Sequence, residues 1–471
     1  MLPKKLQDIH LIGIAGTGMG AFAGLLKQAG YNVRGSDQNA YPPMSDKLAD
    51  WRIPVATPYD AKNLQPKPDL VIVGNVIRRT NVEATFVRDN DWPQTSFPAS
   101  FYELFLNQTH STVITGTHGK TTTSTLTAFT LWHAGKDPGF LIGGIPQDFG
   151  ESFRLGAMKS HTPFVVEGDE YDTAYFDKVP KFQHYKPKSL LCTSLEFDHA
   201  DIYDSLEHIQ DQFRQLFSSM SPQSHVVLYH DAPHLMELVQ SLPKNIHLET
   251  YGDNGDWQSH NFQEGNDGIQ FNIVHNNQNK GQLQLQLSGR HNMLNALGAY
   301  AILNGLGLSH SEIADGFATF KGIKRRMEVV GEVDEVLVID DFAHHPTAVQ
   351  TTLEGARRRY PEHQLWALFE PRSATTCRNI FQEDYAKAFD HADIVLLAPP
   401  GRELPEDEAL NMEQLKSDLK NRSINAHNFA NIDDLLDHAL AHAPKNTVLL
   451  CMSNGAFGGI HTKLIEGLGR R

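Results

Sequence analysis

The chain has 471 residues, 40% of them hydrophobic, and a formal net charge of −15 at pH 7. Its length exceeds what one ordinary hydrophobic core supports and predicts about three folded domains. The acidic balance excludes the basic surface of a typical nucleic-acid-binding protein, and no apolar run is long enough to span a bilayer, so neither nucleic acid nor a membrane is an expected partner.

The first segment, residues 1–107, has the pattern of a parallel α/β unit. Residues 10–14 (HLIGI) predict a buried strand that leads into a glycine turn at 16–21 (GTGMGA) and a helix ending at Gln28. Residues 31–37 predict the next strand. Glycines in such a turn let a pyrophosphate approach the backbone and the following helix N-terminus. On this segment alone, a nicotinamide-dependent enzyme and a turn that only packs a helix remain alternatives.

The second segment, residues 108–322, opens with a phosphate-loop signal. A strand at 112–115 precedes residues 116–123 (GTHGKTTT), and a helix through Trp132 follows. A standard Walker A loop would have glycine where this chain has Ile114. The shorter loop can still wrap phosphate oxygens with its amides, while Lys120 reaches the β- and γ-phosphates and the Thr121 hydroxyl ligates Mg²⁺. The segment therefore predicts a nucleoside triphosphate site.

Two acidic clusters strengthen this prediction. Residues 166–172 (VEGDEYD) follow one apolar strand, and residues 196–201 (EFDHAD) follow another. The carboxyl ends of parallel strands open on the same sheet edge, where ligands bind, and carboxylates there can hold Mg²⁺. Solvated loops that cap helices are the alternative for each cluster taken singly.

The remaining pattern completes an α/β fold class. Alternating apolar residues at 269–273 and 283–287 predict a β-hairpin, and a helix is predicted at 291–305. The third segment, residues 323–471, has apolar strands separated by helical stretches and predicts a further parallel α/β domain. Its strands are predicted at 336–339, 365–369, 394–397 and 447–450. Three widely spaced cysteines and an N-terminus without a signal-peptide pattern favour a cytoplasmic protein.

From about residue 10 to 461, the chain carries motifs that resemble, in order, those of the Mur ligases. They are GIAGTGMG, GSD, GTHGKTTT, EGDEYD, EFDHAD, GRHNMLNALGA, RRME and DDFAHHP. The resemblance implies three domains: a Rossmann-like UDP-sugar-binding domain (1–107), a central P-loop ATPase domain (108–322), and a Rossmann-like C-terminal domain (323–471) that closes on ATP and binds a peptide. It also implies an ADP-forming carboxylate–amine ligase that uses ATP and Mg²⁺, with no obligate protein partner.

The same resemblance implies roles for individual residues. The ATP-binding residues would be Gly116, Thr117, His118, Gly119, Lys120, Thr121, Thr122, His291, Asn292, Asn295, Arg326, Asp341 and His344. The UDP-sugar would contact Gly16, Thr17, Gly18, Met19, Ser36 and Asp37, and the peptide would contact Arg372, Ser373, Asn454 and Phe457. Thr121 would ligate a first Mg²⁺, and Glu167 and His199 would ligate a second. The catalytic residues would be Lys120, Glu167 and His199.

Further stretches resemble one branch of the family, which attaches L-alanyl-γ-D-glutamyl-meso-diaminopimelate to UDP-N-acetylmuramate in peptidoglycan recycling. They are 41–45 (YPPMS), 167–188, 370–373 (EPRS) and 453–459 (SNGAFGG). Residues 372–378 (RSATTCR) replace the basic HRYTRT-like stretch of the L-alanine-adding branch. The alternatives are that L-alanine ligase, a nicotinamide oxidoreductase, and a UDP-sugar sensor without catalysis.

A zinc site at the pair His344 and His345 is not favoured. Adjacent histidines on a strand would point to opposite faces, and no nearby carboxylate is expected to complete a tetrahedral set. For the ligase, the expected chemistry is phosphoryl transfer from ATP to the lactyl carboxylate, followed by attack of the peptide amine. Domain closure is expected because the three ligands bind different domains.

Overall fold

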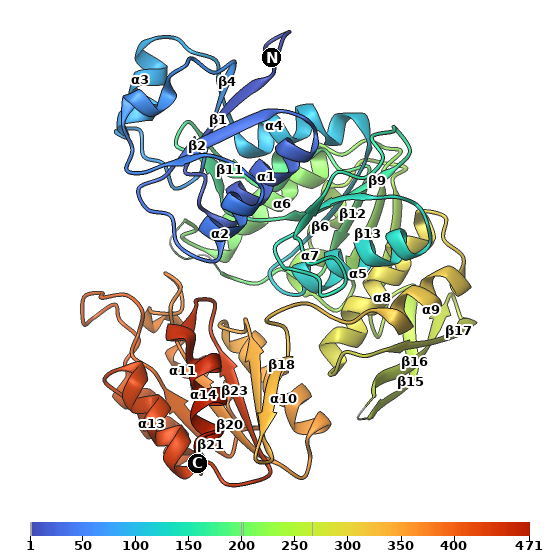
Figure 1. Ribbon diagram of the computed structural model, residues 1–471. Helices are drawn as coiled ribbons and strands as arrows, with labels where there is room; N and C mark the ends of the chain where they lie inside the picture. The colour runs from blue at the N-terminus through green and yellow to red at the C-terminus, as the bar shows by residue number, and fades with distance from the viewer. Residues whose placement is uncertain (1, 199, 201, 266) are drawn as a thin grey trace.

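The computed structural model describes every residue except Met1, His199, Asp201 and Asn266. His199, predicted as a catalytic residue and metal ligand, therefore lies outside the described residues. The chain forms three α/β units in sequence order, coloured blue, cyan to yellow, and orange to red in Figure 1.

The N-terminal unit is a five-stranded parallel sheet with the order β3-β2-β1-β4-β5. The strand order reverses beside β1, and the glycine turn follows β1 at this point, where doubly wound sheets bind their ligands. Its elements are β1 Asp8–Ile12, α1 Thr17–Gln28, β2 Asn32–Ser36, α2 Met44–Asp50, β3 Val55–Ala56, β4 Leu70–Val73, α3 Val82–Asp89, β5 Gln94–Ser96 and α4 Phe97–Leu104.

The central unit is built on a ten-stranded mixed sheet with the order β17-β16-β15-β14-β13-β12-β6-β9-β7-β8. Its strands are β6 His110–Thr115, β7 Gly139–Leu141, β8 Phe153–Arg154, β9 Pro163–Gly168, β12 Ser189–Cys192, β13 His225–Tyr229, β14 His247–Tyr251, β15 Trp257–Gly265, β16 Gly268–His275 and β17 Gln278–Leu285. Its longer helices are α5 Lys120–His133, α6 Leu206–Ser218, α8 Arg290–Gly305 and α9 His310–Thr319.

Both faces of the central sheet are covered, because successive side chains of a strand point to opposite sides. In β6, Val113 belongs to a core shared with α6 and the N-terminal unit, whereas Ile114 belongs to a core with α5 and α8. The first core is continuous across the domain boundary, where Phe101 packs edge-on against Phe164. The N-terminal unit is thereby fixed to the central one.

The predicted hairpin is confirmed as β16 and β17. Its turn residues Asn276 and Asn277 both have positive φ, which asparagine tolerates better than most residues. The sequence pattern did not reveal β15, which pairs antiparallel with β16 and extends the hairpin into a three-stranded meander.

The C-terminal unit is a six-stranded sheet with the order β18-β19-β23-β20-β21-β22, parallel except for β18. The four predicted strands are confirmed as β19, β20, β21 and β23. The elements are β18 Glu328–Val333, β19 Val336–Asp341, α10 Pro346–Arg359, β20 Gln364–Phe369, α11 Gln382–Ala388, β21 Ile394–Leu397, α12 Met412–Asn421, β22 Asn425–Asn428, α13 Ile432–His442, β23 Thr447–Met452 and α14 Ile460–Leu468. No helix in the described part of the chain is long and apolar enough to cross a bilayer.

Candidate active site

The phosphate loop joins β6 to α5, and two of its residues must be glycine. Gly116 has φ +122° and Gly119 has φ +80°, in the region that side-chain-bearing residues rarely adopt. A Cβ atom on Gly116 would lie 2.5 Å from Thr193 Oγ1, and one on Gly119 would lie 2.3 Å from Asn295 Oδ1. The loop thus lies tightly against its neighbours and leads directly into the N-terminus of α5, which favours anions.

Lys120 is the cation of this loop. Its Nζ donates to Gly116 O at 2.6 Å and to Glu170 Oε2 at 2.8 Å, and both charged side chains are largely buried. Burial acts to lower the pKa of Lys120, but the charge and hydrogen bond of Glu170 outweigh it and raise the pKa. Lys120 is therefore protonated at neutral pH and can exchange a protein partner for a phosphate oxygen.

Thr121 and Glu167 form an oxygen pair suited to Mg²⁺. The Thr121 hydroxyl donates to Glu167 Oε1 at 3.0 Å, and Glu167 Oε2 accepts from Gly143 N at 2.8 Å. Octahedral Mg²⁺ with ligands at 2.0–2.1 Å separates adjacent oxygens by about 2.9 Å. The two side chains therefore fit neighbouring positions around that ion without rearrangement.

The start of α8 lies beside the phosphate loop. Asn292 Nδ2 donates to Ser288 O at 2.7 Å, and Asn295 Nδ2 donates to Asn292 Oδ1 at 3.2 Å. Burial and the nearby charge of Arg326 lower the pKa of His291 to about 4, so this imidazole is neutral at pH 7. Asn292 and Asn295 are thus held in place by hydrogen bonds, and Asn295 lies against Gly119 of the loop.

The C-terminal unit brings Arg326 to the same place. Arg326 Nη2 is 3.5 Å from Thr121 Oγ1. Asp341 holds the linker that carries this arginine, because its carboxylate accepts from Met327 N and Ala343 N, each at 2.7 Å. Burial raises the pKa of Asp341. In this conformation its carboxylate binds backbone amides, so a direct contact with ATP stays a prediction.

His344 follows Asp341 in the same loop. Its Nδ1 lies 3.0 Å from Phe342 O, and burial lowers its pKa to about 4. The smaller influences on that pKa include the charges of Asp198, Arg326 and His118. Of the predicted ATP residues of the C-terminal unit, Arg326 contacts the phosphate loop, while Asp341 and His344 hold the loop structure of their own unit.

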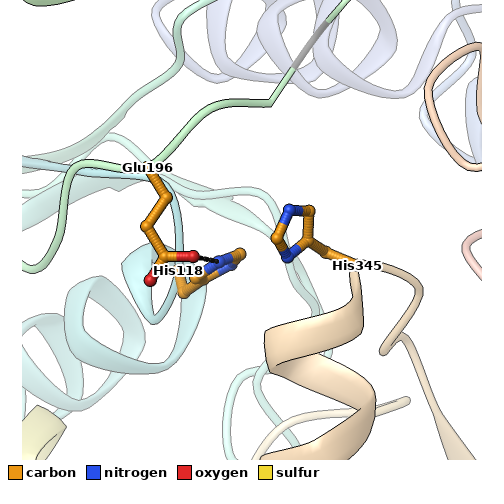
Figure 2. A group of neighbouring side chains, drawn as sticks. All are labelled: His118, Glu196 and His345. Atoms are coloured by element: carbon orange, nitrogen blue, oxygen red, sulfur yellow. Dashed lines mark hydrogen bonds and ion pairs between the residues drawn. The ribbon is translucent and has the colours of Figure 1, made fainter. Parts of the chain in front are cut away.

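A second contact between the two units joins His118, a predicted ATP-binding residue, to three residues that the sequence did not assign to the site: Glu196, His345 and Thr347. His118 Nε2 lies 3.3 Å from Glu196 Oε2, which also accepts from Thr347 Oγ1 at 3.0 Å. The ring of His345 lies 4.8 Å from that of His118, and Figure 2 shows it reaching toward the other two from the start of α10. Glu196 and His345 lie inside recognised motifs, but nothing in the sequence indicates that they meet.

The protonation states of this group follow from its surroundings. Partial burial acts to raise the pKa of Glu196, but the hydrogen bond and charge of His118 outweigh it and lower the pKa to about 2. Burial, followed by the charge of His118, lowers the pKa of His345 to about 4. The expectation that no carboxylate lies near His345 was wrong, because Glu196 is distant only in sequence. His345 is also not on a strand, since it is the N-cap of α10.

The predicted UDP-sugar turn is exposed at the N-terminus of α1. Gly16, Thr17 and Gly18 are on the surface, whereas Met19 is buried. Asp37 lies beside the turn, because its Oδ2 accepts from Ala15 N at 2.9 Å.

Ser36 has no surface available for a ligand. It is fully buried and its hydroxyl donates to the Glu83 carboxylate. In this conformation its hydroxyl links β2 to α3.

Some of the predicted peptide-binding residues can be reached by a ligand in this conformation, and one cannot. Arg372 is half exposed, lies 3.3 Å from Glu370 Oε1, and packs over Gly455, where an added Cβ would lie 2.0 Å from Arg372 Cδ. The hydroxyl of Ser373 donates to Thr376 Oγ1. Asn454 Oδ1 is buried and makes no hydrogen bond to a described residue.

Phe457, in contrast, is fully buried in the core beneath α13 and α14. It presents no surface to a peptide in this conformation.

Comparisons with known proteins agree along the whole chain. The Mur ligase family catalytic domain matches residues 8–105, the Mur ligase middle domain 114–303, and the Mur ligase glutamate ligase domain 325–455. The UDP-N-acetylmuramate–L-alanyl-γ-D-glutamyl-meso-2,6-diaminoheptandioate ligase of Haemophilus influenzae is 38% identical over 98% of this chain and 99% of its own length. The chain belongs to the Mur ligase family. It is accordingly an ATP-dependent, ADP-forming ligase.

Other relatives of this Mur ligase carry two different enzyme names, one for a tripeptide ligase and one for an L-alanine ligase. The Escherichia coli enzyme with the same name as the Haemophilus one is 37% identical over 98% of both chains, whereas a UDP-N-acetylmuramate–L-alanine ligase of Lactococcus lactis is 32% identical over 92% of both. The crystal structure of a murein peptide ligase from Psychrobacter arcticus covers 99% of both chains with a TM-score of 0.74 and 35% identity. The three-domain Mur ligase fold is thereby confirmed.

Proposed function

We propose that this Mur ligase joins the lactyl carboxylate of UDP-N-acetylmuramate to the alanyl amine of L-alanyl-γ-D-glutamyl-meso-diaminopimelate, converting ATP to ADP and phosphate. The observation that carries the chemistry is the convergence of Lys120, the Thr121–Glu167 oxygen pair and Arg326 at one phosphate loop. The tripeptide acceptor is supported by two relatives of that activity, each matched over nearly its whole length.

In the first step, the γ-phosphoryl group moves from ATP to a carboxylate oxygen, which gives ADP and an acyl phosphate. Both reactants are anions, so their approach requires positive charge near the transferred group. Lys120, in the phosphate loop, and Arg326, whose Nη2 lies 3.5 Å from Thr121 Oγ1, supply these cations. The family resemblance implies a first Mg²⁺ at Thr121 and a second at Glu167 and His199, and these ions would neutralise phosphate charge when bound.

In the second step, the neutral amine of the peptide attacks the acyl carbon, phosphate leaves, and the amine loses a proton. The acceptor is placed near Arg372, because a guanidinium can pair with a carboxylate of the acidic tripeptide through two parallel hydrogen bonds. The half-exposed side chain of Arg372 supports this role. Thr375 also lies close to the second acidic loop, since its Oγ1 accepts from Ala200 N at 3.1 Å.

The UDP portion is assigned to the exposed turn at Gly16–Gly18 with Asp37, beside the N-terminus of α1. The reaction is placed in the cytoplasm as part of the same proposal, because ATP and nucleotide sugars are its substrates. The three described cysteines are buried and free, in keeping with a reducing compartment. No protein partner is required by the scheme.

The deciding experiment measures ADP release with UDP-N-acetylmuramate and either tripeptide or free L-alanine. The proposal expects turnover with the tripeptide, a product whose mass equals the two substrates minus water, and little turnover with alanine. The reverse preference would assign the chain to the L-alanine branch, which the 32% identical relative represents. UDP-sugar binding without ADP release would indicate a sensor, and reduction of a nicotinamide cofactor would indicate an oxidoreductase.

A further inference from the structure

The group formed by His118, Glu196 and His345 has the composition of a transition-metal site. One nitrogen or oxygen atom from each side chain lies within 4.8 Å of the other two. His345 is 5% exposed, and its Nε2 makes no hydrogen bond to any described residue. An imidazole nitrogen buried without a partner is costly unless a ligand satisfies it.

Two imidazoles and one carboxylate select a particular class of ion. This set is found around zinc sites that keep one open position, whereas Mg²⁺ prefers oxygen ligands. Tetrahedral zinc with bonds near 2.05 Å separates its ligand atoms by about 3.3 Å. The His118 and Glu196 atoms already lie 3.3 Å apart, so mainly His345 has to approach.

We propose that His118, Glu196 and His345 bind one divalent transition-metal ion such as Zn²⁺, which links the phosphate loop to the C-terminal domain. His118 and Glu196 belong to the central unit, and His345 is the N-cap of α10 in the C-terminal unit (Figure 2). The complete ligand set therefore exists only when the two units are in contact. An ion that binds this arrangement more tightly than the open one stabilises it by the difference in affinity.

Zn²⁺ bound at this site would inhibit the ligase if the central and C-terminal units must separate in each catalytic cycle to release product. The bound ion would slow that opening, and turnover would fall as Zn²⁺ occupies the site. This consequence rests on the proposed function, but the binding of the ion does not.

The test uses the full chain, stripped with a chelator and titrated with Co²⁺, whose visible absorption reports tetrahedral nitrogen and oxygen ligands, followed by competition with Zn²⁺. His345→Asn keeps a good N-cap, and Glu196→Gln keeps an acceptor for Thr347. His225→Gln is the matched control, because His225, His247 and Glu249 form the other histidine–carboxylate group of similar spacing in the described chain.

We expect one ion per chain in the wild type and a loss of affinity of at least about tenfold in each site variant, with no change in the control. Zn²⁺ should also raise the melting temperature of the wild type but not of the site variants. The melting temperatures with and without Zn²⁺ are compared within each variant, so this measurement does not require the variants to be as stable as the wild type.

Unchanged Co²⁺ affinity in both site variants, or a loss in His225→Gln, would overturn the proposal. A radius of gyration that does not decrease when Zn²⁺ is added to the wild type would overturn the link between the domains. An enzyme without ligase activity that still binds the ion at these residues would refute the proposed function alone.

Discussion

Replacing Lys120 with methionine separates the catalytic role of this side chain from its structural one. The change keeps most of the side chain's length and removes the cation from Glu170, whose side chain is 5% exposed. Breaking a buried ion pair typically destabilises by about 3 to 5 kcal/mol. In the Lys120→Met variant, Glu170 can take up a proton instead of remaining charged without its cation. Protonating an ordinary glutamate at pH 7 costs about 3 to 4 kcal/mol, and this value is the upper limit for the cost of the uncompensated charge.

The charge contribution to the loss of unfolding free energy is therefore no more than about 3 to 4 kcal/mol at pH 7, and smaller at pH 5.5, where protonation is easier. The lost hydrogen bonds to Gly116 O and Thr117 O add a contribution that does not depend on pH. Urea unfolding at the two pH values measures it. Adding Glu170→Gln should recover much of the stability, since a neutral amide replaces the carboxylate.

Ligase activity should stay low in the double variant even though its stability is largely recovered. Cations that stabilise transferring phosphoryl groups contribute on the order of a thousandfold or more to kcat, so both Lys120→Met and the double variant should lose ADP release by at least that factor. The reasoning fails if the single variant keeps more than a tenth of wild-type turnover. It also fails if the double variant regains activity along with stability, because Lys120 would then act only as a partner of Glu170.

Three other predictions concern separate parts of the molecule. Thr121→Val removes one member of the oxygen pair with Glu167, so the Mg²⁺ concentration for half-maximal ADP release should rise by about tenfold or more; an unchanged Mg²⁺ dependence would remove Thr121 from the metal site. Gly455→Ala and Arg372→Ala should both raise the KM for tripeptide while the KM for ATP stays constant, because the methyl added at Gly455 occupies the position of the Arg372 side chain. Burial and then the charge of Lys188 lower the pKa of His110 to about 4, below the value of 6.5 for an unfolded histidine. Between these values the unfolded chain binds the proton that the folded chain excludes, so stability falls as pH drops through 6.5 toward 4, by about 1 kcal/mol at pH 5.5. His110→Gln should lose less stability between pH 7.5 and 5.5 in urea titrations, and an identical loss would contradict the assigned cause.

Local sequence determined the elements that frame the site. The GTHGKT loop after an apolar strand was sufficient to predict β6 and the helix α5 that follows it, because hydrophobic periodicity is a local property. The alternating pattern around Asn276 and Asn277 likewise predicted the hairpin. The strands β15 and β18 escaped prediction because their exposed, irregular patterns acquire meaning only through antiparallel partners.

The tertiary structure decided which predicted residues share a site. Glu196 and Thr347 are 151 positions apart, and a hydrogen bond joins them only because α10 of the C-terminal unit lies against the phosphate loop. The sequence also did not predict which of the candidate ligand-binding side chains are buried. Ser36 and Phe457 were predicted to contact ligands, yet both lie inside domain cores, since a motif gives residue identity but not the direction of a side chain. The sequence by itself thus determined the domains' chemistry, whereas packing between domains decided the pairings, because those depend on contacts far apart in the chain.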